Sequence, residues 1–498
     1  MSFRMLGPLA AVLLASCASL PPERGNDRLR QLAAERSGVE LALDAQQRDA
    51  AEADARARLA KPLRVDDAVA VALARSPDVA RALARLGLAW ADLVEASRIS
   101  NPTLSLSALD SDRSGEDTQV GVSFSLGLSD LLVLGSRARI ARGEFDGAQE
   151  EAVRELQSLV AETRKEYFAL VGAEQVARMR DVVATAANAA TALAERYRIA
   201  GNIPAIELNL HQAEGASAAI EAERARADAL SARASFAMRL GLADGEAFAV
   251  AESLPLPAGE LEDADALVAL ALDSRPDLAA ARRRAEVLAD SLGVTRRFRW
   301  LGDFEVGVET ERETDGARLT GPAVSLQLPL FHQNQAAVAR AEARVDLAEA
   351  DALALERSIA QRVRAAHAAV AADRRIVERH RTELMPYREA VVARTQEQVN
   401  FMLAGPFDLI RAKRDEFDAY QGYLEAVRDY WTQRAELGLA VGRVLASDAH
   451  AESSDEVRAT VLPDAAAPMD HGSMRHMQHG AQAEPDSHEH HEHEEPQP

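Results

Sequence analysis

The residues best suited to chemistry lie near the end of the chain, where methionine alternates with histidine. Of the 12 histidines, seven fall between positions 471 and 493, and three of the nine methionines fall between 469 and 477. Thioether sulfur selects Cu(I) or Ag(I), whereas imidazole also binds Cu(II), Zn(II) and Ni(II). We interpret this pattern as a copper-buffering site, and the alternative is a low-complexity tail with incidental affinity. The candidate metal ligands are Met469, His471, Met474, His476, Met477, His479, His488, His490, His491 and His493.

The only cysteine, Cys17, follows a short apolar stretch that begins after Arg4. This arrangement is a secretory signal and is too short to span a bilayer. The sequence Leu-Ala-Ser-Cys at 14–17 resembles the lipobox of bacterial lipoproteins, which implies that Cys17 becomes acylated. Ala18 follows it where an aspartate would resemble a signal for retention in the inner membrane, so the outer membrane is the implied destination. The alternative is an ordinary signal peptide with a chance cysteine.

Composition excludes several classes of function. The 79 acidic and 57 basic residues give a net charge of -22, which argues against nucleic acid as a partner because phosphate binding needs a basic surface. The sequence contains no G-x-x-x-x-G-K-[ST] phosphate loop and no recognisable pairing of histidine with a nucleophile. We therefore expect the chain not to be an enzyme, and any energy source to reside in a partner.

The middle of the chain, between the signal peptide and the tail, contains a duplicated unit. Residues 72–79 (ALARSPDV) return as residues 271–278 (ALDSRPDL), an offset of 199 residues, and three later matches follow in the same order. A period this long indicates one large module used twice. The sequence predicts a signal peptide, an N-terminal linker, two repeats joined by a connector, and a disordered tail. Their ranges are 1–17, 18–62, 63–242, 243–262, 263–445 and 446–498.

Each repeat contains two stretches in which apolar and polar residues alternate, as in strands with one apolar face. The strand pairs lie within 103–128 and 302–330. A soluble sandwich would need a second sheet, which the remaining helical sequence does not supply. A transmembrane barrel instead turns the apolar face to lipid and the polar face to a water-filled lumen. Four strands cannot close a barrel alone, so several chains must contribute to it.

The remaining sequence is helical, so the expected fold class is mostly α with a small β part. Residues 129–200 contain no proline, and 72 residues at 1.5 Å each would reach about 100 Å. A turn at 201–204 reverses the chain, and Pro386 is expected to kink the corresponding helix of the second repeat. The predicted helices are 65–99, 129–200, 206–240, 263–297, 336–403 and 408–444.

The order of these parts, with Asn101-Pro102 at the head of the first strand, resembles the TolC-type outer-membrane efflux proteins. Residues 400–431 look like the branch associated with copper and other heavy metals. The resemblance covers residues 63–444. It implies a homotrimer in which twelve strands close one barrel and twelve long helices continue it as a periplasmic tube. It also implies a periplasmic adaptor and an inner-membrane pump, often of the resistance-nodulation-division type.

In this family the helix turns form a closed periplasmic mouth ringed by acidic residues. Glu207 and Asp408 match acidic positions after the first and second turns. Each would occur three times around the axis and attract cations. Arg411 stands where some members carry another acid, and it could neutralise Asp408. The alternative is that both acids are solvated residues favoured by the dipole at a helix N-terminus.

We therefore expect an outer-membrane lipoprotein duct that exports copper or related cations. One alternative is a duct of the same architecture for organic drugs or secreted polypeptides. Another is a periplasmic coiled-coil lipoprotein that stores metal through its tail and spans nothing.

Overall fold

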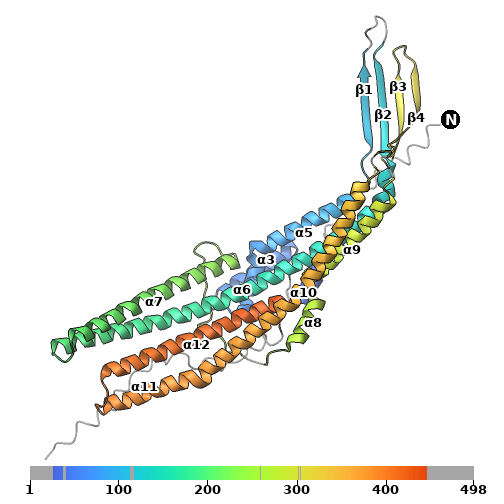
Figure 1. The fold of residues 1–498 in the computed structure, drawn as a ribbon. Helices are drawn as coiled ribbons and strands as arrows, with labels where there is room; N and C mark the ends of the chain where they lie inside the picture. The colour runs from blue at the N-terminus through green and yellow to red at the C-terminus, as the bar shows by residue number, and fades with distance from the viewer. Residues whose placement is uncertain are drawn as a thin grey trace, which may run out of the picture. The chain divides into compact units, whose positions relative to one another are not determined.

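The structure is a computed structural model, and it describes residues 26–37, 41–110, 112, 117–257, 260–300, 302, 304–331 and 333–445. The chain divides into a compact unit of residues 1–455 and a second unit of residues 456–498, which lies wholly outside the described residues. Within the first unit, helices predominate over a single small sheet (Figure 1). This agrees with the expected fold class.

The sheet contains four antiparallel strands in the order β1-β2-β3-β4. β1 (Thr103–Leu109) and β2 (Gln119–Gly127) form the pair from the first repeat, and β3 (Phe304–Arg312) and β4 (Arg318–Leu326) form the pair from the second. Both pairs lie within the predicted ranges. β2 and β3 also pair directly, so the two repeats share one sheet.

Long helices continue from the strands. β2 leads directly into α6, which has the predicted length of 72 residues. The helices in chain order are α2 (Asn26–Ser37), α3 (Ala45–Leu59), α4 (Val65–Arg75), α5 (Pro77–Ala96), α6 (Leu128–Ile199), α7 (Ala205–Leu240), α8 (Ala264–Ser274), α9 (Pro276–Arg297), α10 (Gln335–Arg379), α11 (Met385–Asn400) and α12 (Pro406–Val441).

The prediction of one continuous helix before each strand pair is wrong. Each is divided by a proline, so that α4 and α5 replace the first helix and α8 and α9 the second. Proline disfavours helical backbone in the residue before it. Ser76 accordingly has an extended ψ of 132°, and its side chain accepts a hydrogen bond from the backbone of Asp78. Arg275 has a similar ψ of 124°.

A glycine packs against each of these two helix breaks. Gly241 follows the end of α7, and Gly442 occupies the equivalent position after α12. Gly241 has a φ of 70°, and a Cβ built on it would lie 2.5 Å from the carbonyl oxygen of Arg75. Gly442 has a φ of 81°, and a Cβ built on it would lie 2.9 Å from Cγ of the Arg275 side chain. Only glycine adopts this left-handed backbone without steric cost. The duplication therefore extends to the way each returning helix ends against its repeat.

The helix between residues 335 and 400 is interrupted just before Pro386. Residues His380–Leu384 form a π-helical turn, η2, between α10 and α11. Proline cannot donate a backbone hydrogen bond, and an inserted residue relieves its clash with the preceding turn. The irregularity expected at Pro386 is thus present, and it takes the form of a π-helical turn.

The long helices pack side by side, and the order of neighbours near the sheet differs from the order near the turns. Near the sheet, α6 contacts both α5 and α9, and α9 contacts α10, which repeats the strand order. Near the turns, α6 contacts both α7 and α12, and α12 contacts α10 and α11. Figure 1 shows the two hairpins, α6 with α7 and α11 with α12, running in the same direction. Each repeat therefore contributes one hairpin to the same end of the unit.

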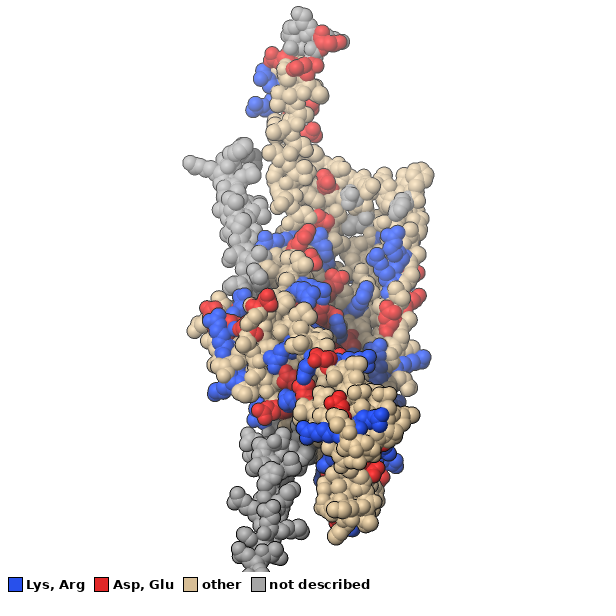
Figure 2. Space-filling model, turned by 90° about the vertical axis from the view of Figure 1, so that its left-hand side faces the viewer, with Lys and Arg blue, Asp and Glu red and all other residues tan. Residues whose placement is uncertain are grey.

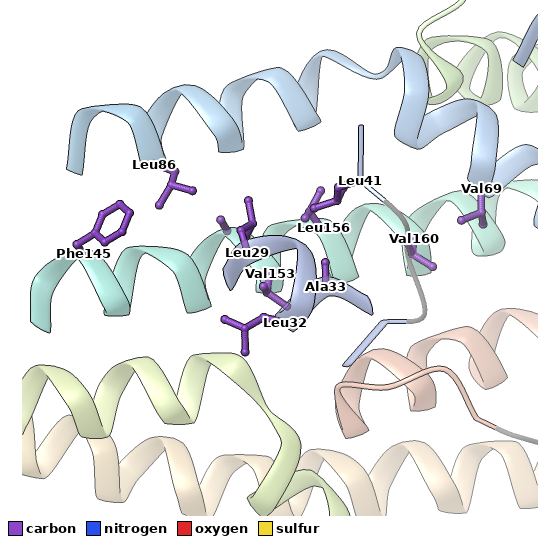
Figure 3. Packing of buried hydrophobic residues seen from close by; sticks show 11 residues of the cluster. Leu29, Leu32, Ala33, Leu41, Val69, Leu86, Phe145, Val153, Leu156 and Val160 are labelled. Carbon is purple, nitrogen blue, oxygen red and sulfur yellow. The ribbon is translucent and has the colours of Figure 1, made fainter. Parts of the chain in front are cut away.

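The segment before the first repeat contains α2 and α3, which the sequence did not predict. Leu29, Leu32 and Ala33 of α2 enter an apolar cluster with Val153 and Leu156 of α6. Figure 3 shows these side chains lying against one another, with Leu86 of α5 and Phe145 nearby. This part of the range 18–62 is therefore packed against the first repeat by burial of apolar surface.

The connector between the repeats is held by α12. Trp431 stacks on Phe168 with ring centroids 5.2 Å apart, and its Nε1 donates to the carbonyl oxygen of Pro255 at 2.6 Å. The buried Arg434 guanidinium donates to both carboxylate oxygens of Glu262 at 2.8 Å. These contacts fix the position of the connector beside the helices.

Candidate channel surfaces

The strand register places the alternating residues on two chemically different faces. Leu104, Phe124, Val308 and Pro322 are directly opposite one another across the four strands. Side chains opposite one another in an antiparallel sheet share a face. This row and its neighbours therefore form an apolar face that crosses the boundary between the repeats. Its apolar members are Leu104, Leu106, Ala108, Val120, Val122, Phe124, Leu126, Phe304, Val306, Val308, Pro322, Val324 and Leu326, and at the strand ends away from the helices Thr310, Thr320, Arg312 and Arg318 lie on the same face.

Much of the apolar face is exposed in the single chain. Leu106 has an exposed fraction of 73%, Val324 of 68% and Phe124 of 51%. On the side of the molecule seen in Figure 2, the strands carry few charged side chains, whereas the helices carry many of both signs. A contiguous exposed apolar surface of this kind marks contact with a membrane or another protein.

The opposite face of the sheet is polar and acidic. Serines from β1 and β2 share this face with Glu305, Glu309 and Glu311 of β3. Gln119 donates a side-chain hydrogen bond to Glu311. Gly307 also lies here, and a Cβ on it would be 2.5 Å from the carbonyl oxygen of Phe124. Gly307 is therefore a poor position at which to test the effect of a charge on this face, and Ser123 is the better test position.

The candidate mouth acids lie in the first turns of the two returning helices. Glu207 is half-buried at the start of α7, and Asp408 is exposed at the start of α12. A carboxylate oxygen of Asp408 accepts a hydrogen bond from the backbone of Gly405 at 3.0 Å. This is the capping-box contact, in which an acid at the third helical position accepts a hydrogen bond from the backbone of the N-cap residue. Within the described residues, Arg411 is exposed and forms no ion pair with Asp408.

The turns of the two repeats are joined by aromatic contacts. The Phe407 ring, next to Asp408, stacks on the His211 ring of α7 with centroids 4.2 Å apart. It also meets Tyr197 of α6 edge-on at 5.6 Å. Thr191 donates to the backbone carbonyl of His211 at 2.9 Å. The candidate acids therefore stand on two helix ends that contact each other within one chain.

Ion pairs extend this contact along the helices. Arg414 of α12 pairs with Glu214 of α7 at 3.2 Å. Arg180 of α6 pairs with Glu221 of α7 at 2.9 Å and with Asp418 of α12 at 3.3 Å. These ion pairs could not be predicted from the sequence, because charged residues occur all along the long helices and only the tertiary structure shows which of them meet.

Cys17 and all ten candidate metal ligands lie outside the described residues. In the part of the chain that the structure describes, no three or more histidine, cysteine, aspartate or glutamate side chains gather in a way that could hold a metal ion. None of the described helices is long and apolar enough to cross a membrane.

Comparison with known proteins gives a family match over part of the chain and a similar fold over most of it. Residues 68–242 match the family described as outer membrane efflux protein. A comparison with curated proteins gave no match. The fold is similar to that of CusC, with 16% identity and a TM-score of 0.62 over 76% of this chain and 92% of that one.

Two further channels share the fold. The CmeC outer membrane channel of Campylobacter jejuni has 16% identity and a TM-score of 0.63, over 76% of this chain and 85% of that one. The open MtrE outer membrane channel of Neisseria gonorrhoeae has 18% identity and a TM-score of 0.61, over 76% of this chain and 89% of that one. These likenesses show that both repeats together form the fold of such channels.

Proposed function

We propose, on the premise that residues 68–242 match the outer membrane efflux protein family, that this chain is one subunit of an outer-membrane efflux channel. The observation that carries the proposal is the sheet, whose apolar face is exposed and continuous across both repeats. Among the described strands, β1 and β4 each have only one neighbour. Unpaired strand edges are not tolerated in hydrocarbon, so other copies must supply the missing neighbours.

A homotrimer satisfies this requirement, with three copies of the four-stranded sheet closing one barrel. The helices support the same assembly. Near the turns they form the row α7-α6-α12-α11, and the two helices at its ends, α7 and α11, expose apolar side chains. Met238 and Leu230 of α7 have exposed fractions of 71% and 67%, and Tyr387 of α11 has 71%. Packing α7 against α11 of the next copy would cover these residues and close the helices into a tube.

The acids Glu207 and Asp408 then line the mouth at the end of the tube. Replacing both, as Glu207→Gln with Asp408→Asn, should lower cation selectivity and block by multivalent cations in planar bilayers, without dissociating the trimer. Asparagine keeps an oxygen that can accept the Gly405 hydrogen bond. Removal of Arg411 should strengthen cation block if it screens Asp408. Unchanged selectivity in the double variant would mean that both acids serve only their helix ends.

The export path requires partners, because the sequence contains no phosphate-binding loop that could couple an energy source. We assign a periplasmic adaptor and an inner-membrane pump, of the resistance-nodulation-division type, to this role. The outer membrane itself is the third partner, and nucleic acid is not among them.

Copper is the proposed substrate, supported by the mixed methionine and histidine ligands of residues 469–493. Deleting the gene for this chain should sensitise cells to copper and silver salts and leave their drug tolerance unchanged. Sensitivity to organic drugs alone would favour a drug duct of the same architecture. If the chain were instead a storage lipoprotein, outer-membrane fractions would contain no heat-resistant, β-rich trimers of it.

We propose that Cys17 is acylated, because it ends the lipobox-like sequence Leu-Ala-Ser-Cys at 14–17. The variant Cys17→Ser should no longer incorporate labelled fatty acid.

A further inference from the structure

Where the chain passes from helix to strand, the second repeat carries three arginines and two aromatic residues, whereas the first repeat carries one arginine and no aromatic residue. Residues 296–300, between the end of α9 and β3, read Arg-Arg-Phe-Arg-Trp. At the offset of 199 residues, the first repeat has Ser-Arg-Ile-Ser-Asn at 97–101. The second repeat therefore gains two arginines and two aromatic rings at a corresponding position.

Two of the three arginines keep their charge available. Arg296 pairs with Glu342 at 2.5 Å. The Arg299 guanidinium lies over the Trp300 ring, 4.5 Å from its centroid, and that of Arg297 lies 5.8 Å from the ring of the residue after it. Among the described residues, neither Arg297 nor Arg299 pairs with a carboxylate. A guanidinium held against an aromatic ring retains its donors for a second anionic partner.

The connection from β4 to α10 lies beside this segment. Asn334, at the start of α10, donates from Nδ2 to the carbonyl oxygen of Arg299 at 3.2 Å. The same connection exposes Phe331 at 97% and Leu330 at 67%, and Trp300, next to Arg299, is 53% exposed. Arginine beside exposed aromatic and apolar side chains is the composition of a membrane–water interface, where the rings lie at the level of the head groups.

The segment also lies at the right level of the sheet. The strands are antiparallel, so the ends of β2 and β4 and the starts of β1 and β3 lie at the same edge as the helices. If the strands cross the outer membrane, as the proposed function requires, this edge meets the periplasmic leaflet. Phosphate groups are concentrated there, and the planar guanidinium binds phosphate through two parallel hydrogen bonds.

We propose that Arg297, Arg299, Trp300 and Phe331 bind the head groups of anionic phospholipids in the periplasmic leaflet. The two arginines contact the phosphates, and the two rings occupy the boundary between head groups and acyl chains. This inference rests on the proposed function. It implies that the second repeat contacts anionic lipid more strongly than the first.

The test measures quenching of tryptophan fluorescence by brominated lipids in the full-length protein reconstituted in phosphatidylcholine vesicles. The fluorescence of Trp300 is obtained by subtracting the emission of the Trp300→Phe variant from that of the unmodified protein. Trp300 should be quenched more strongly by brominated phosphatidylglycerol than by brominated phosphatidylcholine at equal mole fraction. Basic residues near an anionic surface each favour association by about fivefold. The preference should weaken at 1 M salt, where screening reaches about 3 Å.

Charge variants separate head-group binding from general effects. Arg297→Gln with Arg299→Gln should remove the preference for phosphatidylglycerol, whereas Arg297→Lys with Arg299→Lys should keep most of it. Arg282→Gln with Arg283→Gln is the control, because it removes two exposed arginines from α9, the helix that ends at Arg297, at a distance from the sheet. Loss of the preference in this control would overturn the proposal.

A second reporter separates failure of this inference from failure of the proposed function. Phe124→Trp, in the Trp300→Phe background, should be quenched by both lipids if the strands lie in the membrane. Quenching of this reporter without quenching of Trp300 would overturn the inference alone. Equal quenching of Trp300 by both lipids would overturn the assignment to anionic head groups. Absence of quenching at both positions would overturn the proposed channel as well.

Discussion

At the scale of single residues, the close packing of α6 against α9 depends on a glycine. A Cβ built on Gly143 of α6 would lie 2.1 Å from Cγ2 of Val287 on α9. Gly143→Ala must displace Val287 or separate the helices, which should cost about 1 to 3 kcal/mol of unfolding free energy. Gly147→Ala, one turn later with no atom within 4 Å of its Cβ, should instead stabilise α6 by up to about 1 kcal/mol.

Chemical unfolding of the purified protein measures both changes. Adding Val287→Ala to Gly143→Ala should recover much of the loss, because it removes the methyl groups that the new Cβ meets. If Gly143→Ala were as stable as Gly147→Ala, the close packing of the two helices would be wrong.

The π-helical turn gives a second prediction at this scale. Burial lowers the pKa of His380, and a hydrogen bond with the backbone of Ala419 offsets part of this effect. Its buried Nδ1 has no hydrogen-bond partner among the described residues. The unfolded chain therefore takes up this proton more readily than the folded chain. The free energy of unfolding should decrease as the pH falls below the ordinary histidine pKa of about 6.5.

Unfolding curves at pH 7.5 and pH 5.5 measure this dependence. His380→Gln should reduce the difference in stability between the two pH values. An unchanged difference would show that other groups account for it.

At the scale of the elements, the two faces of β2 should respond oppositely to charge. Phe124→Arg should cost about 2 to 4 kcal/mol if its face meets lipid near the middle of the bilayer. Ser123→Arg, the adjacent position on the opposite face, should leave folding intact and change single-channel conductance. Folding titrations into vesicles and planar-bilayer recordings provide the two measurements. Equal tolerance of arginine at both positions would contradict a strand with one lipid face and one lumen face.

At the scale of the whole molecule, the tail is separable from the repeats that form the helices and strands. Deleting residues 447–498 should leave trimers intact and reduce copper resistance without abolishing it. An isolated peptide of residues 469–493 should bind Cu(I) more tightly than Zn(II), because thioether ligands prefer soft ions. Leucine at positions 469, 474 and 477 should weaken Cu(I) binding and spare Zn(II) at the later histidines.

Calorimetry under reducing conditions and growth in copper test these two expectations. If Zn(II) bound as tightly as Cu(I) and the truncated strain grew normally in copper, the tail would carry no information about the substrate.

The sequence by itself determined the parts whose signal is local. Alternation of apolar and polar residues located four strands, and the run without proline gave α6 its length. The offset between residues 72–79 and 271–278 identified the duplication. Such features depend on the periodicity of one element or on the φ that proline imposes, and both are written in neighbouring residues.

Only the tertiary structure decided which elements meet. Periodicity defines the apolar face of β2 but not its neighbour, and the pairing with β3 makes that face continuous across the repeats. The contact of Phe407 with His211 and the packing of α2 on α6 were likewise not readable from sequence. These contacts join residues far apart in the chain, and their free energy comes from burial between surfaces that no single segment contains.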